Sequence, residues 1–352
     1  MSLYFANALP DMVDDALAGF ALAHADTVRW DERDGYLCAL RTAPARRVGL
    51  VSGGGSGHEP LHTGYVGAGM LDAACPGRVF ASPHNRQVFA AARSVAREDG
   101  VLLLVKNYTG DRINFGIAAE RLAHEGIRCG RVLIDDDVAS QSADSATGRR
   151  GTGAAVLVEK ILGAAADTGC GLADLEALGA EVVARCRSLA VASAPHTSPV
   201  TGAPAFELRP GTLEYGVGIH GERAARTLPA RSLRDLAEEM VASLADALGL
   251  GGRSRLIVLV NGLGGVTRLE LYAVLREVAR LLDKRGADTV RVLVGDFVTA
   301  LDMRGFSVTL LDANDELLRL YDAPAAAPAW PATPAPPPDR LGEVPQTTGE
   351  AP

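Results

Sequence analysis

Polar side chains that could act on a small ligand stand in four short segments of this chain. The segment VSGGGSGHEPL, residues 51–61, places a histidine directly after a run of glycines, and VKNYTGD, residues 105–111, ends an aliphatic run with a lysine and an aspartate. A serine lies in VFASP and a second histidine in GVGIHGE. Histidine is a titratable group that can accept a proton from a bound ligand, and a carboxylate can support such a proton transfer. The candidate residues are therefore His58, Ser82, Lys106, Asp111 and His220.

The glycine-rich segment can bring main-chain N–H groups close to a small polar ligand, because glycine has no Cβ atom to hold the ligand away. It is not a P-loop, since His58 and Glu59 follow Gly57 where that motif has Lys and then Ser or Thr. It is not the dinucleotide fingerprint G-x-G-x-x-G either, because His58 or Pro60 occupies the third glycine position. The segment is interpreted as a ligand-binding loop or as a tight turn from a strand into a helix.

The other candidates have structural alternatives. His220 could be a turn histidine, Asp111 could cap a helix that begins at Arg112, and Lys106 could be a solvated strand end. His62 and His84 are treated as structural.

Three consecutive aspartates, 135–137, raise the question of a metal ion. Only Asp135 and Asp137 could share it, since successive side chains of a strand face opposite sides. No other carboxylate pair is evident, so we expect no metal site. We assign these aspartates, and also Arg149 and Arg150, to structural or docking roles.

The elements that must position these residues follow an α/β pattern. Aliphatic runs of strand length alternate with helical patterns, which predicts two α/β domains with largely parallel or mixed sheets. The expected strands are 48–51, 101–105, 132–134, 189–192, 256–260 and 290–294. The expected helices are 87–97, 115–124, 153–167, 172–185, 233–248 and 268–284, the last preceded by a capping-box pattern at Thr267 and Glu270. In such folds ligands bind at the carboxyl ends of strands.

At 352 residues the chain is long enough for two domains. We expect an N-terminal α/β domain over 1–185 that carries the glycine-rich segment and a C-terminal α/β domain over 186–323 that carries His220, with the ligand site near the interface between them. Nine of the chain's 19 prolines lie between Pro324 and Pro352. We therefore expect residues 324–352 to form a disordered tail or a linker.

The composition and charge of the chain argue against some classes of binding partner. The formal net charge is −8 and no basic cluster offsets it, which argues against nucleic acid and against an anionic membrane surface. No run approaches the ~18 apolar residues of a membrane helix, and the N-terminus lacks the basic region of a secretion signal. The five cysteines are far apart, with no C-x-x-C pair, as is typical of a reducing compartment. We expect a cytoplasmic protein.

The candidate segments, in their order along the chain, resemble one enzyme family. GLVSGGGSGHEPLHTGYVGAGMLDAACPG is followed by VFASP, LLLVKNYTGDRINF, VLIDDDVA, GRRGTGA and EYGVGIHGE. Together they resemble the substrate-binding subunit or domain of dihydroxyacetone (glycerone) kinases, over about residues 10–324. The resemblance implies a phosphotransferase with an alcohol group as acceptor, and a homodimer.

The resemblance also implies roles for the candidate residues. His220 matches the histidine whose ring nitrogen adds to the C2 carbonyl of the ketose and forms a covalent hemiaminal, which selects ketones over glycerol. Asp111 and His58 match the pair that hydrogen-bonds the reacting terminal hydroxyl; we assign His58 as proton acceptor and Asp111 as its orienting partner, an order that the sequence does not fix. Four further positions match ligand contacts, and Ser82 lies at the same pocket wall. These four are Gly55, Ser56, Gly57 and Lys106.

The resemblance finally implies a second component. The chain has no P-loop or kinase signature, so we expect it to bind no cofactor itself. ATP and Mg²⁺, or a phosphohistidine donor, would come from a nucleotide-binding or relay partner. Residues 84–88 read HNRQV where a stretch like TPDQ is expected, which leaves open a four-carbon ketose such as erythrulose. A ketose sensor that signals to a transcription factor is the other alternative, and it would need His220 but not Asp111 and His58.

Overall fold

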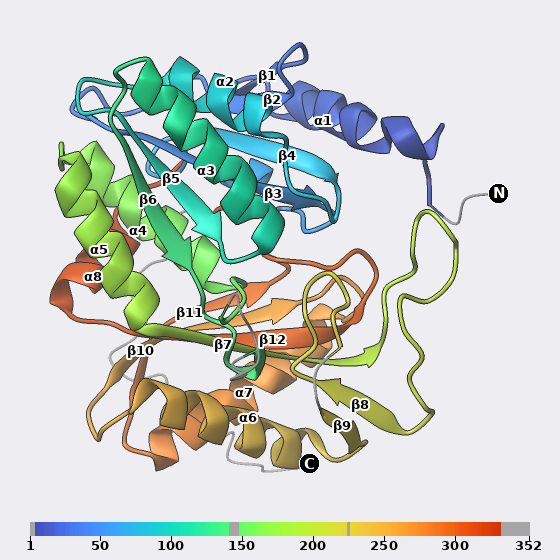
Figure 1. Cartoon of the computed structure of the whole chain (residues 1–352). Coiled ribbons are helices and arrows are strands. Elements are labelled where there is room, and N and C mark those ends of the chain that lie inside the picture. The colour runs from blue at the N-terminus through green and yellow to red at the C-terminus, as the bar shows by residue number, and fades with distance from the viewer. Residues whose placement is uncertain (1–3, 141–147, 224–225, 332–352) are drawn as a thin grey trace, which may run out of the picture.

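The computed structural model describes residues 4–140, 148–223 and 226–331. Its strands form two six-stranded sheets that are stacked with helices between them and on their outer faces (Figure 1). The α/β class expected from the sequence is confirmed, and every expected strand and helix overlaps an observed one. No helix in these three ranges is long and apolar enough to cross a membrane.

The first sheet has the order β1-β2-β4-β3-β5-β6. Strands β4, β3, β5 and β6 run parallel, while β1 and β2 form an antiparallel hairpin at one edge. Helices α2 and α3 pack on one face of this sheet, and α1 packs near the hairpin (Figure 1). The strands are β1 (Val28–Asp31), β2 (Tyr36–Ala39), β3 (Gly49–Ser56), β4 (Ala73–Val79), β5 (Val101–Lys106) and β6 (Cys129–Ile134), and the helices are α1 (Met12–Ala23), α2 (Asn85–Val95) and α3 (Thr109–His124).

The order of these strands creates a switch point between β3 and β5. The chain leaves β3 toward β4 on one side and leaves β5 toward β6 on the other, so the connections diverge after two neighbouring parallel strands. Ligands bind in the crevice at the carboxyl ends of such strands. His58 follows β3, and Lys106 and Asp111 follow or end β5, so the sheet brings these three candidates to one place.

The glycine run differs from the expected loop. Residues 53–56 continue β3 and pair with Cys75–Val79 of β4 in a parallel ladder. A Cβ atom on Gly53 would lie 2.4 Å from the Cys75 carbonyl oxygen, and one on Gly55 would lie 2.7 Å from the Ala81 nitrogen. The glycines therefore allow close approach of neighbouring backbone, which is a recognised use of glycine inside a strand.

The second sheet has the order β11-β10-β12-β7-β8-β9, in which only β10 and β11 are parallel. Helices α6 and α7 cover its outer face (Figure 1). The capping box at Thr267 and Glu270 is confirmed at the start of α7. The elements are β7 (Cys186–Ala194), β8 (Thr212–Tyr215), β9 (Arg226–Pro229), β10 (Arg255–Gly262), β11 (Asp288–Gly295), β12 (Arg304–Asp312), α6 (Leu233–Leu248) and α7 (Arg268–Lys284).

Three helices lie between the two sheets: α4 (Ala154–Asp167), α5 (Leu172–Ala184) and α8 (Asp315–Asp322). Every residue of α4 from Ala154 to Ala166 is buried, as is typical of a helix enclosed on all sides. Side chains of both sheets, among them Leu102 of β5 and Leu259 of β10, join one hydrophobic core with α4. The chain passes to the second sheet at Cys186, next to the predicted boundary; the division into two domains stays a prediction.

The first residues of the predicted disordered tail are packed in the structure. Ala326 donates its N–H to the Ala68 carbonyl, and Ala329 donates to the Gly64 carbonyl, both at 2.8 Å. Trp330 is 7% exposed and meets Tyr321 with ring centroids 5.8 Å apart. The tail prediction is therefore wrong for 324–331, because these residues form main-chain hydrogen bonds with the first half of the chain and Ala327 and Trp330 join the hydrophobic core. Residues 332–352 lie outside the described ranges.

Candidate functional site

His58 is fully buried between the two halves of the chain. Its Nδ1 lies 2.7 Å from the Thr299 carbonyl oxygen, so Nδ1 carries the proton and donates it. Its Nε2 is buried and has no hydrogen-bond partner among the described residues. Burial lowers the pKa of His58 well below the usual 6.5, and the nearby His220 and Lys106 lower it further. His58 is thus a neutral imidazole with an unengaged acceptor nitrogen.

The turn before His58 is held from the second half of the chain. Gly57 has φ +96°, a conformation that favours glycine, and its carbonyl accepts the Leu301 N–H at 2.9 Å. Its own N–H donates to the Glu59 carboxylate at 2.9 Å, and the Ser56 hydroxyl donates to the Gly77 carbonyl at 2.7 Å. These two donors already have protein partners, so the predicted ligand contacts of Ser56 and Gly57 would need other atoms or an exchange of partners.

His220 comes to the site from the segment between β8 and β9. Its Nδ1 lies 3.0 Å from Glu222 Oε1, and its main-chain N–H donates to Glu222 Oε2 at 3.0 Å. Because a carboxylate only accepts, Nδ1 is the protonated nitrogen and Nε2 keeps its lone pair. Burial would raise the pKa of Glu222, but the hydrogen bond from His220, the electrostatic interaction with that ring and the charge of Arg150 outweigh it and lower this pKa to about 2.

Aromatic rings bring the two histidines together. The centroids of His58 and His220 are 4.7 Å apart. Phe80 stacks on His58 at 4.9 Å, and Tyr108 meets His220 edge-on at 4.6 Å. Phe80 has φ +56°, an uncommon conformation for a bulky residue that is found at turns and functional sites. The two predicted histidines therefore lie next to each other, with their rings edge to face.

Asp111 lies in the first turn of α3 and is 3% exposed. The Ser82 hydroxyl donates to its Oδ1, and the Lys106 ammonium nitrogen lies 4.0 Å from its Oδ2. The helix begins at Thr109 and not at Arg112, so Asp111 does not act as the helix cap. Lys106 is 1% exposed and is not a solvated strand end. The half-buried Ser82 and the buried Asp111 and Lys106 thus form one polar cluster beside the histidine pair.

His62 and Glu159 extend this cluster into the protein. Nε2 of His62 lies 2.6 Å from Lys106 Nζ, and Nδ1 contacts the Glu159 carboxylate. Burial raises the pKa of Glu159 to about 8, although the charge of Lys106 opposes the rise. Burial, Lys106 and His58 hold the pKa of His62 well below 6.5.

Comparison with known proteins decides the family. The model of the Dak1 domain matches residues 18–329. The chain belongs to the Dak1 domain family. The "PTS-dependent dihydroxyacetone kinase 1, dihydroxyacetone-binding subunit DhaK" of Listeria innocua is 40% identical over 325 residues, which cover 92% of this chain and 98% of that one. The "PEP-dependent dihydroxyacetone kinase, dihydroxyacetone-binding subunit DhaK" of Escherichia coli is 39% identical over 348 residues, 92% of this chain and 97% of the other.

Solved structures agree with this Dak1 domain. The dihydroxyacetone kinase of C. freundii in its native form superposes with a TM-score of 0.88 at 34% identity, over 100% of this chain and 64% of that enzyme. The "Dihydroxyacetone kinase operon co-activator Dha-DhaQ" superposes with a TM-score of 0.86 at 32% identity, over 92% of this chain and 99% of the other. The resemblance to dihydroxyacetone kinases is confirmed, and relatives of this fold include a regulator.

Sequence reasoning missed several residues that shape the site of this Dak1 domain: Phe80, Tyr108, Glu222 and Thr299. Glu222 stands two residues after His220 in the segment GIHGE, so a carboxylate within reach of the ring could have been noticed there. Thr299 is 241 positions from His58, and no local pattern links the two. His62, taken as structural, lies in direct contact with Lys106.

The three aspartates have protein partners. Asp135 pairs with Arg149 at 3.0 Å and Asp137 with Arg150 at 2.7 Å. Asp136 accepts hydrogen bonds from Thr152 N at 2.7 Å and Ala154 N at 3.0 Å, and so holds the start of α4. No group of three or more metal-ligating side chains occurs in the described ranges. The structural roles expected for these residues are supported.

The stretch HNRQV forms the start of α2. The His84 side chain caps this helix by accepting the Arg86 N–H at 3.1 Å, and the Gln87 amide donates to the Pro76 carbonyl at 2.7 Å. These side chains thus stabilise the turn after β4. The identity of the ketose stays open.

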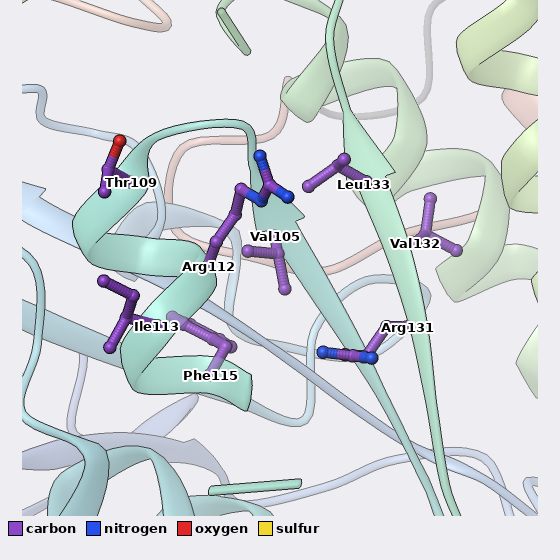
Figure 2. Close-up of a pocket in the computed structure, with 8 residues that line it drawn as sticks. All are labelled: Val105, Thr109, Arg112, Ile113, Phe115, Arg131, Val132 and Leu133. Carbon is purple, nitrogen blue, oxygen red and sulfur yellow. The ribbon is translucent and has the colours of Figure 1, made fainter. Parts of the chain in front are cut away.

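A groove of about 620 Å³ opens on the surface between α3 and β6 (Figure 2). Figure 2 shows Arg112 and Ile113 of α3 on one side and Arg131 and Leu133 of β6 on the other. None of its eight lining residues is a predicted site residue. The groove is therefore separate from the site built around His58, Asp111 and His220.

Proposed function

We propose that this chain captures a ketose as a hemiaminal on His220 and presents its terminal hydroxyl for phosphorylation by a donor bound to a partner. The observation that supports the capture step best is the bond from His220 Nδ1 to Glu222, because it leaves the lone pair on Nε2. As Nε2 bonds to C2, the carbonyl oxygen becomes a hydroxyl by taking one proton from solvent. The ring then carries a positive charge, which the Glu222 carboxylate balances.

The pair His58 and Asp111 would serve the phosphoryl transfer. The unengaged Nε2 of buried, neutral His58 is suited to accept the proton of the terminal hydroxyl as its oxygen attacks phosphorus. Asp111, held by Ser82, would orient that hydroxyl. Lys106 would stabilise negative charge on the oxygens of this cluster, since its ammonium nitrogen is 4.0 Å from Asp111 Oδ2.

The donor would come from outside this chain. Two relatives are named PTS-dependent and PEP-dependent, and a C. freundii relative is described in complex with AMP-PNP and Mg²⁺. The C. freundii enzyme is longer, and this chain spans 64% of it. We include both ATP with Mg²⁺ and a phosphohistidine protein as donors in the proposal. We also propose a cytoplasmic homodimer.

A ketose-sensing co-regulator is the second candidate, favoured by the likeness to the co-activator. Capture alone would need His220 and Glu222. Here Asp111, Ser82 and His58 also form an ordered cluster beside them, which supports the kinase.

Phosphorylation of dihydroxyacetone tests the proposal. The chain alone, with ATP and Mg²⁺, should transfer nothing, and addition of a nucleotide-binding partner subunit or a phosphohistidine relay should start turnover. Erythrulose and glycerol are run in parallel to define the substrate. Turnover of even ~1 per second by the chain alone would contradict the two-component proposal, and its absence with every donor would favour the sensor.

A further inference from the structure

A chain of buried polar groups runs from Lys106 into the core, and its inner members, Ser52, His62 and Glu159, have no part in the proposed capture or transfer steps. Lys106 Nζ contacts His62 Nε2 at 2.6 Å, and His62 Nδ1 contacts both Glu159 of α4 and the Ser52 hydroxyl, the latter at 3.0 Å. All four side chains are at most 4% exposed. Burying so many polar groups is costly unless each finds a partner, so the arrangement calls for a reason.

The direction of each hydrogen bond follows from Ser52. Its hydroxyl proton is donated to the Leu104 carbonyl at 2.9 Å, so Ser52 Oγ is the acceptor toward His62. His62 Nδ1 therefore bears the ring proton and also donates to Glu159, which leaves a lone pair on Nε2. That lone pair accepts a hydrogen from Lys106.

The same bonds orient the Lys106 ammonium group. It donates to His62 Nε2 and, at 3.2 Å, to the Gly53 carbonyl. With two of its three hydrogens so directed, the third can turn toward Asp111, whose Oδ2 is 4.0 Å away. Contacts with His62, the Gly53 carbonyl and Asp111 thus determine where the positive charge of Lys106 lies in the site.

Gly54 makes room for this charge. Its φ does not require glycine, but a Cβ atom at Gly54 would lie 2.2 Å from Lys106 Nζ and 3.5 Å from His62 Nε2. The middle glycine of the run is thus explained by the ammonium group that lies over the strand.

We propose that His62 and Glu159 are positioning residues for phosphoryl transfer, which hold the protonated Lys106 side chain beside Asp111. This inference rests on the proposed function and adds two residues to its site. The titratable groups that face Lys106 are Asp111 on α3, Glu159 on α4, and His58 and His62 after β3. Burial lowers the pKa of Lys106, and the charges of Asp111 and Glu159 oppose that change.

The test compares His62→Leu with His62→Gln in the full chain with its donor partner, by turnover from pH 6 to 10. Leu has no acceptor for Lys106, whereas the Gln carbonyl can take the place of Nε2. A hydrogen bond to a charged group contributes about 1.5–3 kcal/mol, which corresponds to roughly one to two pKa units. The alkaline limit of turnover is the pH above which turnover falls as Lys106 loses its proton. We expect this limit to move down by about one to two pH units in His62→Leu and by less than half of that in His62→Gln.

Two controls separate positioning from loss of stability. Asp72→Asn breaks another buried ion pair of the first half, that with Arg46 and Arg97, and should lower thermal stability without moving the alkaline limit. The double variant Lys106→Met/His62→Leu should differ from Lys106→Met in turnover by less than twofold. His62 acts through the Lys106 ammonium group, and that group is already absent in Lys106→Met. If His62→Leu does not fold, Gly54→Ala makes the same test, since its Cβ displaces the ammonium group.

The outcomes are distinct from those of the proposed function. If the unsubstituted chain and donor do not phosphorylate any ketose, the proposed function fails. If they do, and His62→Leu or Gly54→Ala keeps the alkaline limit of the unsubstituted chain, the positioning role of His62 and Glu159 is overturned. An additive loss on the Lys106→Met background would overturn it as well.

Discussion

Replacement of Glu222 by glutamine should weaken ketose capture while leaving the shape of the site unchanged. The carboxylate accepts two hydrogen bonds of 3.0 Å from His220, one from Nδ1 and one from the main chain. A charge-assisted bond of this kind contributes about 1.5–3 kcal/mol, or roughly 10- to 150-fold in affinity. The Glu222 side chain is 37% exposed, so solvent screening places the expected loss near the lower end, at about tenfold.

A change of tautomer adds to this loss. The amide of glutamine can offer its NH₂ group to Nδ1, which would move the ring proton to Nε2 and remove the lone pair that attacks the ketone. Titration calorimetry of dihydroxyacetone with the original chain, Glu222→Gln and Glu222→Asp measures the effect, and glycerol serves as the ligand that forms no adduct. Glu222→Asp should lose less affinity than Glu222→Gln. If Glu222→Gln binds dihydroxyacetone as tightly as the original chain, or loses as much affinity for glycerol as for dihydroxyacetone, Glu222 does not support capture.

Three further predictions concern Asp111, His58 and the packed C-terminal segment 324–331. Asp111→Asn should lower turnover with a competent donor by roughly 10² to 10⁴ and change ketose affinity by less than about threefold; parallel losses in single-turnover and binding assays would remove Asp111 from the transfer step. Because the pKa of buried His58 lies below its unfolded value, the unfolded chain binds more protons below pH 6.5 and stability falls with falling pH. Denaturant unfolding between pH 6.5 and 5 measures how the free energy of unfolding falls with pH. In His58→Gln this fall should be smaller than in the original chain, by up to about 1.4 kcal/mol per pH unit. An equal fall in both proteins would contradict a buried neutral His58. Trp330→Ala should lower the free energy of unfolding by about 3–5 kcal/mol, whereas a loss below ~1 kcal/mol would show that residues 324–331 do not stabilise the fold.

The regular elements followed from local pattern. The amphipathic periods of 233–248 and 268–284 predicted α6 and α7 with their observed bounds, because both helices bury one face against a sheet and expose the other. The start of α3 at Thr109 was missed, since Tyr108 at its N-cap makes no side-chain capping bond that a sequence pattern could reveal.

Residues 53–57 and 324–331 have conformations that depend on contacts with distant residues, which a local sequence pattern does not reveal. Four glycines within five residues indicate a loop, but here the backbone of β4 and the Lys106 ammonium lie so close to Gly53 and Gly54 that only glycine fits in the strand. Prolines after Asp322 indicate disorder, yet Ala326 and Ala329 form main-chain hydrogen bonds with Ala68 and Gly64, more than 100 positions earlier in the chain. In both cases the deciding neighbour is distant in sequence.

The candidate site was found in part. His58, Asp111 and His220 were predicted through family motifs, and the structure brings His58 and His220 into contact and places Asp111 in the Ser82 and Lys106 cluster. Glu159 could not be predicted, because it stands in an apolar stretch of α4 and its role depends on contact with His62, 97 positions away. The role of a buried carboxylate can be assigned only when the group that it contacts is known.

The central claim is covalent capture on His220, and ¹³C NMR of dihydroxyacetone labelled at C2 tests it most directly. We expect the bound label to lose its carbonyl signal and to gain that of a tetrahedral carbon bonded to nitrogen, and we expect His220→Ala to abolish this signal. A bound ketose that keeps its carbonyl signal in the unsubstituted chain would show that His220 forms no covalent adduct.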